Sequence, residues 1–436
     1  MTTTLFQRLP PALHHRDFRL LWIGQLVSMI GTQMQLTALD WHVFKLLEGS
    51  TLTVSVFGIQ IDLQAEALGL GTSGLVRIIP IIFFALVGGV LADTRDRRKL
   101  MLWTQSVAAL LAALLALLTL TDSVTLPAIY LLTAAGSAVS AFDNPARQSL
   151  VPKLVPREHL TNAVSLNTLM WQFGTIVGPG IAGFLLSKFD PGLIYALNAV
   201  SFGAVIVALL LMRYRGHAAA ENTGLGWRAM VEGLRFTYRS RIIWGTMLLD
   251  FFATFFSSAR TMLPIVASSI LHVGPEGYGL LVTAQPVGAA LAGTMTSLRK
   301  DIHRQGTVLL ASVIVYGLAT ALFGISTIFA LSYVLFALTG AADTVSTVIR
   351  GTIRQLLTPD HLRGRMTSVN MIFFMGGPQL GELEAGVVAA LFGAPFAIFS
   401  GGIATVLLTL WIAWKYPRLR SYTSETQAAA AVAAAD

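Results

Sequence analysis

The sequence predicts an all-α integral membrane protein with twelve transmembrane helices in two pseudo-symmetric six-helix bundles. Three observations lead to this prediction: an apolar composition, twelve separate apolar stretches, and an internal repeat near half the chain length. Of the 436 residues, 54% are hydrophobic and only 12% are charged, whereas soluble domains carry roughly 25% charged residues. The mean hydropathy of +0.68 agrees with a chain that lies largely within a bilayer.

The apolar stretches are long enough to cross the hydrocarbon core, which takes about 20 largely apolar residues in a helix. Gly and Pro recur within them, which membranes tolerate because neighbouring helices satisfy the freed backbone groups. The predicted spans cover residues 20–46, 70–92, 100–121, 126–146, 162–187, 192–212, 242–270, 277–298, 306–325, 328–349, 366–392 and 395–415.

An ungapped repeat relates the segment 147–183 to the segment 350–386 at a constant offset of 203 residues. An offset near half the chain length is typical of membrane transporters built from two related halves. The sequence therefore favours a transporter made of two homologous bundles. The matched pairs are Arg147/Arg350, Leu154/Leu357, Pro156/Pro359, Ser165/Ser368, Asn167/Asn370, Gly174/Gly377, Gly178/Gly381, Ala182/Ala385 and Gly183/Gly386.

The spans divide the chain into five parts. We expect a cytoplasmic N-terminus (1–19), an N-terminal six-helix bundle (20–212), a cytoplasmic linker (213–241), a C-terminal six-helix bundle (242–415) and a cytoplasmic tail (416–436). The linker is rich in Arg, and its part from Trp227 to Tyr238 forms either a helix on the anionic leaflet surface or a simple tether. The outer connection at 47–69 has no interpretation from Ile59 to Ala67.

The basic residues set the orientation, because Lys and Arg beside the spans are retained in the cytoplasm. With both termini cytoplasmic, all of the 30 Lys and Arg lie at cytoplasmic ends or loops except Lys45, Arg77, Lys188 and Arg260. The net charge of +8 therefore indicates topology, and we expect the lipid bilayer rather than a nucleic acid as the partner. The absence of cysteine excludes disulfides, thiolate catalysis and Cys-ligated metals.

Charged residues within the spans divide the helices into two groups. A buried charge costs at least about 2.5 kcal/mol in hydrocarbon, so it normally faces a cavity or a partner. The third, sixth, ninth and twelfth spans lack such residues, and we expect them to be outer supports. The charges within the first, second, seventh, tenth and eleventh spans include Asp40, Arg77, Asp250, Arg260, Asp343, Glu382 and Glu384.

Two local patterns indicate a family. The segment from Gly89 to Lys99, GVLADTRDRRK, resembles the cytoplasmic loop of the major facilitator superfamily, with Asp96 where that family usually has Gly. Gly174, Gly178, Pro179 and Gly183 in the fifth span resemble the family's antiporter motif, although a generic packing face would show the same spacing. This resemblance implies the major facilitator fold, a latch at the cytoplasmic side and a helix that packs closely or bends at Pro179.

Three further segments, at 143–152, 358–366 and 379–386, resemble the branch that contains enterobactin exporters and macrolide efflux proteins. The resemblance implies a secondary active transporter of the bacterial cytoplasmic (inner) membrane, working by alternating access and coupled to protons. Its substrate would be an amphipathic small molecule such as a siderophore, a macrolide or another drug-like compound. The family is usually monomeric, and no cofactor is implied.

Coupling needs a group whose proton affinity differs between conformations, and carboxylates in a poorly hydrated cavity meet this need. Glu382 is the first candidate, followed by Asp40 and Asp343. Glu382 and Glu384 lie about 200° apart around a helix, so they cannot both face the cavity. A permanent ion pair or a capped helix end remains the alternative for each candidate. The further candidates are Glu384, Asp250, Arg260 as an anion-binding group, and Arg77 as a partner of Asp40.

A cytoplasmic gate is the second expected site. Arg147 and Arg350 occupy equivalent positions in the repeat, and Asp93 is an expected partner for one of them. Asp143 lies one helical turn before Arg147, where a pair within the helix would be structural. The expected gate residues are Gly89, Asp93, Arg97, Arg98, Asp143, Arg147 and Arg350.

Enzyme functions find little support. Gly69, Gly71 and Gly74 match a dinucleotide-binding pattern, but they join two spans and lack the strand and helix that such a site needs. The sequence contains no Walker A or zincin motif, so we expect neither an enzyme nor a metal site. The remaining alternatives are an importer or a lipid flippase of the same fold, or a membrane receptor that does not transport.

Overall fold

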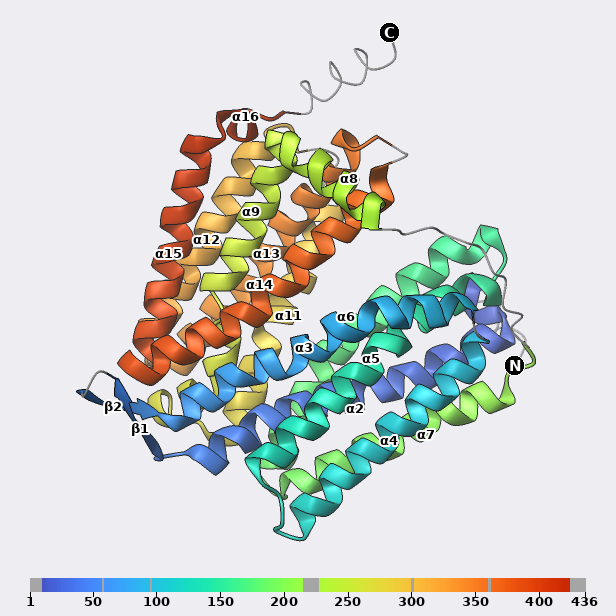
Figure 1. The fold of residues 1–436 in the computed structure, drawn as a ribbon, viewed down its shortest axis with the longest axis horizontal. Coiled ribbons are helices and arrows are strands. Elements are labelled where there is room, and N and C mark those ends of the chain that lie inside the picture. The colour runs from blue at the N-terminus through green and yellow to red at the C-terminus, as the bar shows by residue number, and fades with distance from the viewer. Residues whose placement is uncertain are drawn as a thin grey trace. The chain divides into compact units, whose positions relative to one another are not determined.

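The computed structural model describes residues 10–56, 59–94, 96–214, 227–298, 302–359 and 362–423. Within these ranges the chain forms the twelve long helices that the sequence predicts, together with one two-stranded sheet (Figure 1). The first and last segments of the predicted termini, at 1–9 and 424–436, and the linker residues 215–226 lie outside the described part.

The first compact unit comprises Met1–Leu46 and Val76–Asn222. Its described elements are η1 (Pro11–His14), α2 (Arg16–Leu47), the later part of α3 (Ala65–Thr94), α4 (Arg97–Leu120), α5 (Leu126–Leu154), η2 (Arg157–His159), α6 (Leu160–Leu186) and α7 (Pro191–Leu211).

The second compact unit comprises Leu47–Leu75 and Thr223–Asp436. Residues 47–75, which lie within the predicted N-terminal bundle, thus group with the second unit. The bundle limits of 20–212 and 242–415 remain a prediction. The elements are β1 (Thr51–Val56), β2 (Ile59–Gln64), the first part of α3, α8 (Trp227–Arg239), α9 (Arg241–Phe256), η3 (Ala259–Met262), α10 (Leu263–Ile265), η4 (Val266–Ile270), α11 (Gly274–Leu298), α12 (Gln305–Ile325), α13 (Phe329–Leu357), α14 (Arg363–Phe392), α15 (Ala394–Lys415) and α16 (Pro417–Arg420).

Helix composition follows from the membrane environment. Among the described residues, nine helices are long and apolar enough to cross a membrane. The helices α2, α11 and α14 are also of spanning length, and Gln25, Gln33 and Gln35 illustrate the polar residues that α2 carries. Polar residues in a membrane helix normally face the interior of a bundle, so these helices are suited to line a pathway.

The two units share a packing pattern. In the first unit α4 packs against α7 and α5, and in the second unit α12 packs against α15 and α13. These helices include all four predicted outer supports. The apolar cores lie within each unit, around Phe18, Met101 and Leu150 in the first and around Leu309, Ile353 and Ile412 in the second.

Repeated glycines bring equivalent helices into close contact. A Cβ on Gly178 of α6 would lie 2.5 Å from the Gln33 Cβ on α2, and one on Gly381 of α14 would collide with the Phe255 carbonyl oxygen on α9. Such separations leave no room for a side chain, because the two backbones meet directly. The repeat at an offset of 203 residues therefore preserves the same helix contact in both units.

Two segments of the chain have a structure that the sequence did not predict. The predicted span at 242–270 is interrupted: α9 ends at Phe256, and the short helical segments η3, α10 and η4 follow. The Ser257 hydroxyl bonds to the Thr405 hydroxyl at 2.8 Å just after this end, and Pro264 lies in the first turn of α10, where its missing backbone N–H is tolerated. The outer connection, for which the sequence offered no interpretation, forms the antiparallel hairpin β1–β2.

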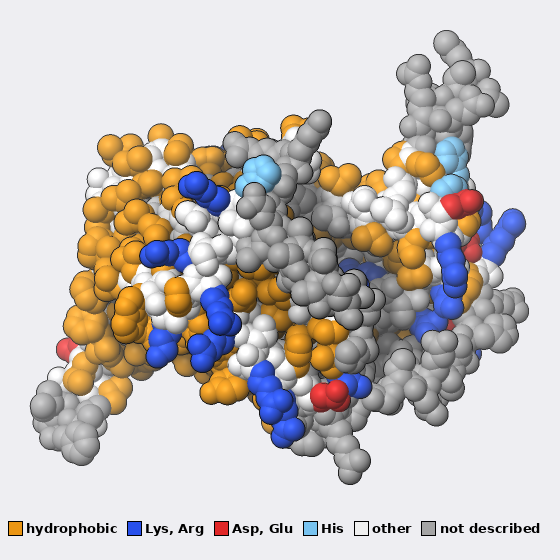
Figure 2. Space-filling view, turned by 90° about the horizontal axis from the view of Figure 1, so that it is seen from above, with side chains coloured by type: hydrophobic (Ala, Val, Ile, Leu, Met, Phe, Trp, Pro, Cys, Tyr) orange, Lys and Arg blue, Asp and Glu red, His pale blue; other side chains and the backbone are white. Residues whose placement is uncertain are grey.

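The basic side chains gather at one end of the second unit. Figure 2 shows blue Lys and Arg side chains on the face seen from above, and apolar side chains on the flanks. The helices α8 and α16 lie at this end (Figure 1), and α16 contributes Arg418 and Arg420. The α8 helix packs against α14 and α9, and Glu232 of α8 forms an ion pair with Arg365 of α14.

The close approach at Gly178 predicts a sensitivity to the smallest added side chain. We expect Gly178→Ala to destabilise the protein by about 1–3 kcal/mol, the usual cost of overpacking a well-packed contact. The matched control is Gly203→Ala on α7, where a Cβ would meet nothing within 4 Å. The midpoint of thermal unfolding in detergent should fall for the first variant and stay or rise for the second. Equal midpoints for both variants would contradict direct helix contact at Gly178.

Candidate functional site

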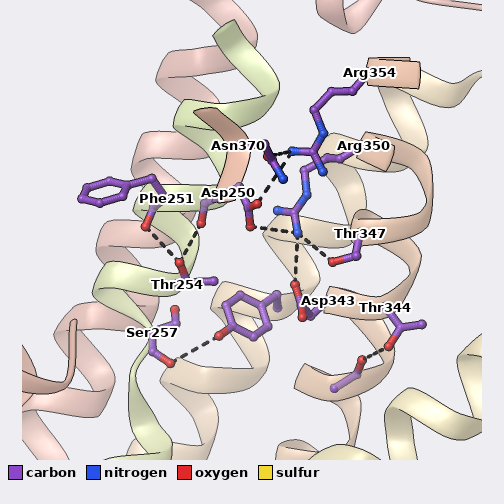
Figure 3. Close-up of polar contacts among 12 residues, drawn as sticks. Asp250, Phe251, Thr254, Ser257, Asp343, Thr344, Thr347, Arg350, Arg354 and Asn370 are labelled. Carbon is purple, nitrogen blue, oxygen red and sulfur yellow. Dashed lines mark hydrogen bonds and ion pairs between the residues drawn. The ribbon is translucent and has the colours of Figure 1, made fainter. Parts of the chain in front are cut away.

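A network of four charged side chains lies inside the second unit, where α9, α13 and α14 meet (Figure 3). The α13 helix supplies one stripe of polar residues at positions i, i+4, i+7 and i+11, which places them along one helix face. These residues are Asp343, Thr347, Arg350 and Arg354. The α9 helix supplies Asp250, and α14 supplies Asn370.

Arg350 is the centre of the network. Its Nη2 atom lies 3.0 Å from Asp250 Oδ1 and 3.4 Å from Asp343 Oδ1, and it donates a hydrogen bond to Thr347 Oγ1 at 2.8 Å. The Arg350 side chain is 2% exposed and that of Asp250 is 4% exposed. An isolated charge at this depth would be very costly, so the two carboxylates make the burial of the guanidinium possible.

Arg354 completes the charge balance one turn further along α13. Its Nη1 atom donates to Asn370 Oδ1 at 2.6 Å and lies 3.9 Å from Asp250 Oδ2. The two oxygens of Asp250 are therefore divided between two guanidinium groups. With all four groups ionised, the two Arg and two Asp side chains sum to no net charge.

The carboxylates of Asp250 and Asp343 differ strongly in their exposure to solvent. The Asp343 side chain is 42% exposed, whereas that of Asp250 is 4% exposed, and Asp343 also stands further from Arg350. Coulomb attraction falls with distance and with hydration, so Asp343 is the more weakly held partner.

The first unit contains a cavity of about 300 Å³. Apolar residues such as Leu36, Trp171 and Phe202 line it together with amide, hydroxyl and charged groups. Such a mixture suits an amphipathic ligand, since apolar walls supply affinity and a few polar groups fix orientation. The polar lining residues are Gln25, Ser28, Thr32, Gln33, Gln35, Arg77, Thr104, Gln105, Thr133, Ser137, Ser140, Asp143, Asn144, Arg147 and Asn198.

Asp40 and Arg77 form an ion pair in the first unit, with Arg77 Nη2 2.5 Å from Asp40 Oδ1. Each side chain is 19% exposed, and Arg77 also lines the cavity. The pairing that the sequence suggested is thus present. An anionic group in the cavity could compete with Asp40 for the guanidinium.

The remaining predicted coupling residues lie elsewhere. Glu382 lies on α14 where this helix crosses α3, and its Oε2 atom is 2.8 Å from the place where a Cβ on Gly74 would stand. Glu384 is partly buried on the same helix, and Arg260 is exposed in η3. The structure therefore brings Asp250, Asp343 and Arg350 together and places Glu382, Glu384 and Arg260 at separate positions.

The predicted gate residues of the first unit make mainly structural contacts. Arg147 Nη2 donates to Asn144 Oδ1 at 2.6 Å, whereas Asp143 accepts from Thr104 Oγ1 at 2.7 Å and from Gln105 Nε2 at 2.9 Å. The α4 helix therefore lines the cavity and binds the Asp143 carboxylate. This differs from the prediction that α4 is only an outer support.

The basic loop before α4 is held by backbone contacts. Arg98 Nε donates to the Leu209 carbonyl oxygen at 2.6 Å, and Arg97 begins α4. Asp96 caps this helix by accepting from the backbone N–H groups of Arg98 and Lys99. Asp96, which stands where the major facilitator pattern usually has Gly, is thus the N-cap of α4. Gly89 and Asp93 lie in α3, and their side chains fall outside the described part.

The sequence did not point to Thr347 or Arg354 as members of the charge network, nor to the contact of Asn370 with Arg354. The spacing of Thr347 and Arg354 from Asp343 and Arg350 is a signal in the sequence, because it places all four polar side chains on one face of a helix that continues past the predicted span. Asn370 belongs to the internal repeat, but its contact with Arg354 depends on how two helices pack, which spacing does not specify.

Comparisons with known proteins agree with this architecture. Residues 9–434 match a family described as transmembrane secretion effector. The chain is 25% identical to the enterobactin exporter of Salmonella choleraesuis (strain SC-B67) and 24% identical to that of Escherichia coli O1:K1 / APEC, with 94% of each chain covered in both cases.

Solved transporter structures share the fold at low sequence identity. A bacterial homologue of the iron transporter ferroportin in an inward-facing state is 15% identical, with a TM-score of 0.68 and coverage of 93% of this chain and 99% of that one. A bacterial homologue of the human lysosomal transporter Spinster, also inward-facing, is 12% identical, with a TM-score of 0.66 and coverage of 94% and 97%.

The network predicts a strong energetic coupling between Arg350 and Asp250. Arg350→Gln alone should destabilise the protein by about 3–5 kcal/mol, because it leaves a buried carboxylate without its main partner. Adding Asp250→Asn should restore much of the loss, since Asp343 and Arg354 then balance each other. Thermal unfolding midpoints of the two single variants and the double variant provide the test. Strictly additive losses would show that the two side chains do not depend on each other.

Proposed function

The chain belongs to the transmembrane secretion effector family of the major facilitator superfamily, and from this premise we propose that it exports an amphipathic small molecule from the cytoplasm in exchange for protons. Members of this superfamily are multi-pass membrane transporters of small molecules rather than enzymes. The proposal therefore concerns the cargo, the direction and the coupling ion.

The observation that carries proton coupling is the sharing of Arg350 between two unequal carboxylates. Asp250 is 4% exposed and Asp343 is 42% exposed, yet both lie within reach of the same Nη2 atom. Coupled transport requires a group whose protonation differs between two conformations. Asp343 is the group best placed for this role, because it can lose its proton to water without stranding the buried guanidinium.

The charge balance gives Asp343 two distinct states. When Asp343 is ionised, the network is neutral and Arg350 is held from both sides. When Asp343 is protonated, the network carries one positive charge and Arg350 is held by Asp250 alone. A change of one charge beside the buried guanidinium would bias α13 between two arrangements.

Glu382 is the second candidate for proton exchange. Its carboxylate lies in the tight crossing of α3 and α14, next to Gly74. A change in how closely the two helices approach would alter the surroundings of this carboxylate, as a proton carrier in alternating access requires. Asp40 is a weaker candidate, because Arg77 already holds it in an ion pair. Asp250 serves better as the fixed partner of Arg350.

The cavity of the first unit supports an amphipathic cargo. Its apolar walls suit a hydrophobic body, and Arg77 offers a cation to an acidic group. The enterobactin exporters among its relatives favour the siderophore class, with macrolides and other drug-like compounds as further substrates to test. We place the protein in the bacterial inner membrane as a monomer with both termini in the cytoplasm, a topology that the distribution of Lys and Arg supports.

Proton movement in proteoliposomes tests the proposal. With an imposed proton gradient and a pH probe inside, catecholate siderophores, macrolides or lipophilic cations should cause a ligand-dependent change in internal pH. Asp343→Asn should abolish this change while ligand binding persists, because the amide cannot exchange a proton. Glu382→Gln is measured in parallel to compare the two candidate carriers.

Asp122→Asn is the matched control, because it removes an exposed carboxylate in the turn between α4 and α5. Its proton movement should equal that of the unmodified protein. Ligand binding without proton movement for any compound would refute antiport and favour a uniporter, a lipid flippase or a receptor. Proton movement in the same direction as the ligand would instead identify an importer.

A further inference from the structure

The hairpin β1–β2 has two chemically different faces. Its antiparallel register pairs Leu52 with Leu63 and Val54 with Ile61, and these pairs alternate with Thr51–Gln64, Thr53–Asp62 and Ser55–Gln60. Successive residues of a strand point to opposite faces. All aliphatic pairs therefore lie on one face, and all polar pairs lie on the other.

The apolar face is covered only in part. On β2, Ile61 and Leu63 are half-buried while the polar residues that alternate with them, Gln60, Asp62 and Gln64, are exposed, and β2 contacts α14. On β1, the side chains of Leu52 and Val54 are 49% and 43% exposed. The protein thus covers the β2 half of the face and leaves the β1 half open.

The hairpin is tied closely to membrane-spanning helices. The α2 helix ends at Leu47 and β1 begins at Thr51, while β2 ends at Gln64 and α3 begins at Ala65 without an intervening residue. Six-residue strands reach only about 20 Å. The hairpin therefore stays next to the ends of these helices, at the end of α14 where Figure 1 places it.

We propose that the open apolar face of the hairpin, at Leu52 and Val54, rests in the interfacial region of the adjacent bilayer leaflet. The surface it would extend is already apolar, because the same end of α14 carries the exposed residues Leu391 and Phe392. In water a two-stranded hairpin is only marginally stable, so an apolar medium against Leu52 and Val54 stabilises it. The free strand edges need hydrogen bonds from water or headgroups, which places the hairpin at the interface rather than in the hydrocarbon.

Charge and size favour lipid over a protein partner. The two strands contain a single charged residue, Asp62, which accepts a hydrogen bond from Thr53 at 2.7 Å on the polar face. A protein interface normally has a polar rim around its apolar centre. A stable dimer also buries about 800 Å² on each partner, which the two open side chains on β1 cannot supply. The leaflet is the outer one if the proposed topology holds.

The absence of cysteine from the chain makes a direct test possible. Val54→Cys and Thr53→Cys each introduce one thiol, on the apolar and the polar face of the same strand, for an environment-sensitive fluorophore. The labelled full-length proteins are placed in phosphatidylethanolamine and phosphatidylglycerol vesicles. The label at Val54 should be quenched several-fold more by lipids with a shallow nitroxide than the label at Thr53, and iodide should show the opposite order.

Each other outcome overturns the proposal. Equal access of iodide to both labels would mean that the apolar face is in water. Shielding at Val54 that disappears at a higher lipid-to-protein ratio would identify a second copy of the chain as the cover. Shielding from both quenchers at every ratio would mean that the protein itself covers the face. Unchanged thermal unfolding midpoints confirm that both labelled proteins are folded, and the result does not depend on transport activity.

Discussion

The buried guanidinium of Arg350 is the constraint around which the second unit is organised. A cation that is 2% exposed needs fixed negative charge nearby, and the structure supplies it from two helices. Asp250 ties α9 to α13, and Arg354 ties α13 to Asn370 of α14. Three helices are therefore held in register by electrostatics as well as by packing, and any change in the charge of one member alters the contacts of all three.

The two halves of the repeat share their packing and differ in their chemistry. The glycines at equivalent positions make the same close helix contacts in each unit. At the same offset, however, Ser140 and Val151 stand where the second unit has Asp343 and Arg354. Arg147 consequently bonds to Asn144 within its own helix. Duplication has preserved the scaffold, and the ionisable network exists in its complete form in the second half.

The sequence predicted what depends on composition and local spacing. Twelve spans follow from apolar length, and the glycine contacts follow from a repeat of small residues. The sequence marks Asp250 and Asp343 as costly charges within spans and Arg350 as an expected gate residue, but their meeting depends on distances between helices. The end of α9 at Phe256 has no Pro or Gly beside it in the sequence to mark it. Apolar and polar residues alternate along both strands of the hairpin. In so apolar a chain, however, a short strand is hard to distinguish from the end of a membrane span.

The α3 helix follows the hairpin directly in the chain and packs against Glu382 of α14. It begins directly after β2, and its Gly71 and Gly74 pack against Gly386 and Glu382 of α14. A helix is stiff along its axis, so a displacement of the first turns of α3 from α14 must also move the strand that precedes them. The same displacement would open the space around the Glu382 carboxylate and admit water. The position of the hairpin and the surroundings of Glu382 therefore depend on the same crossing of two helices.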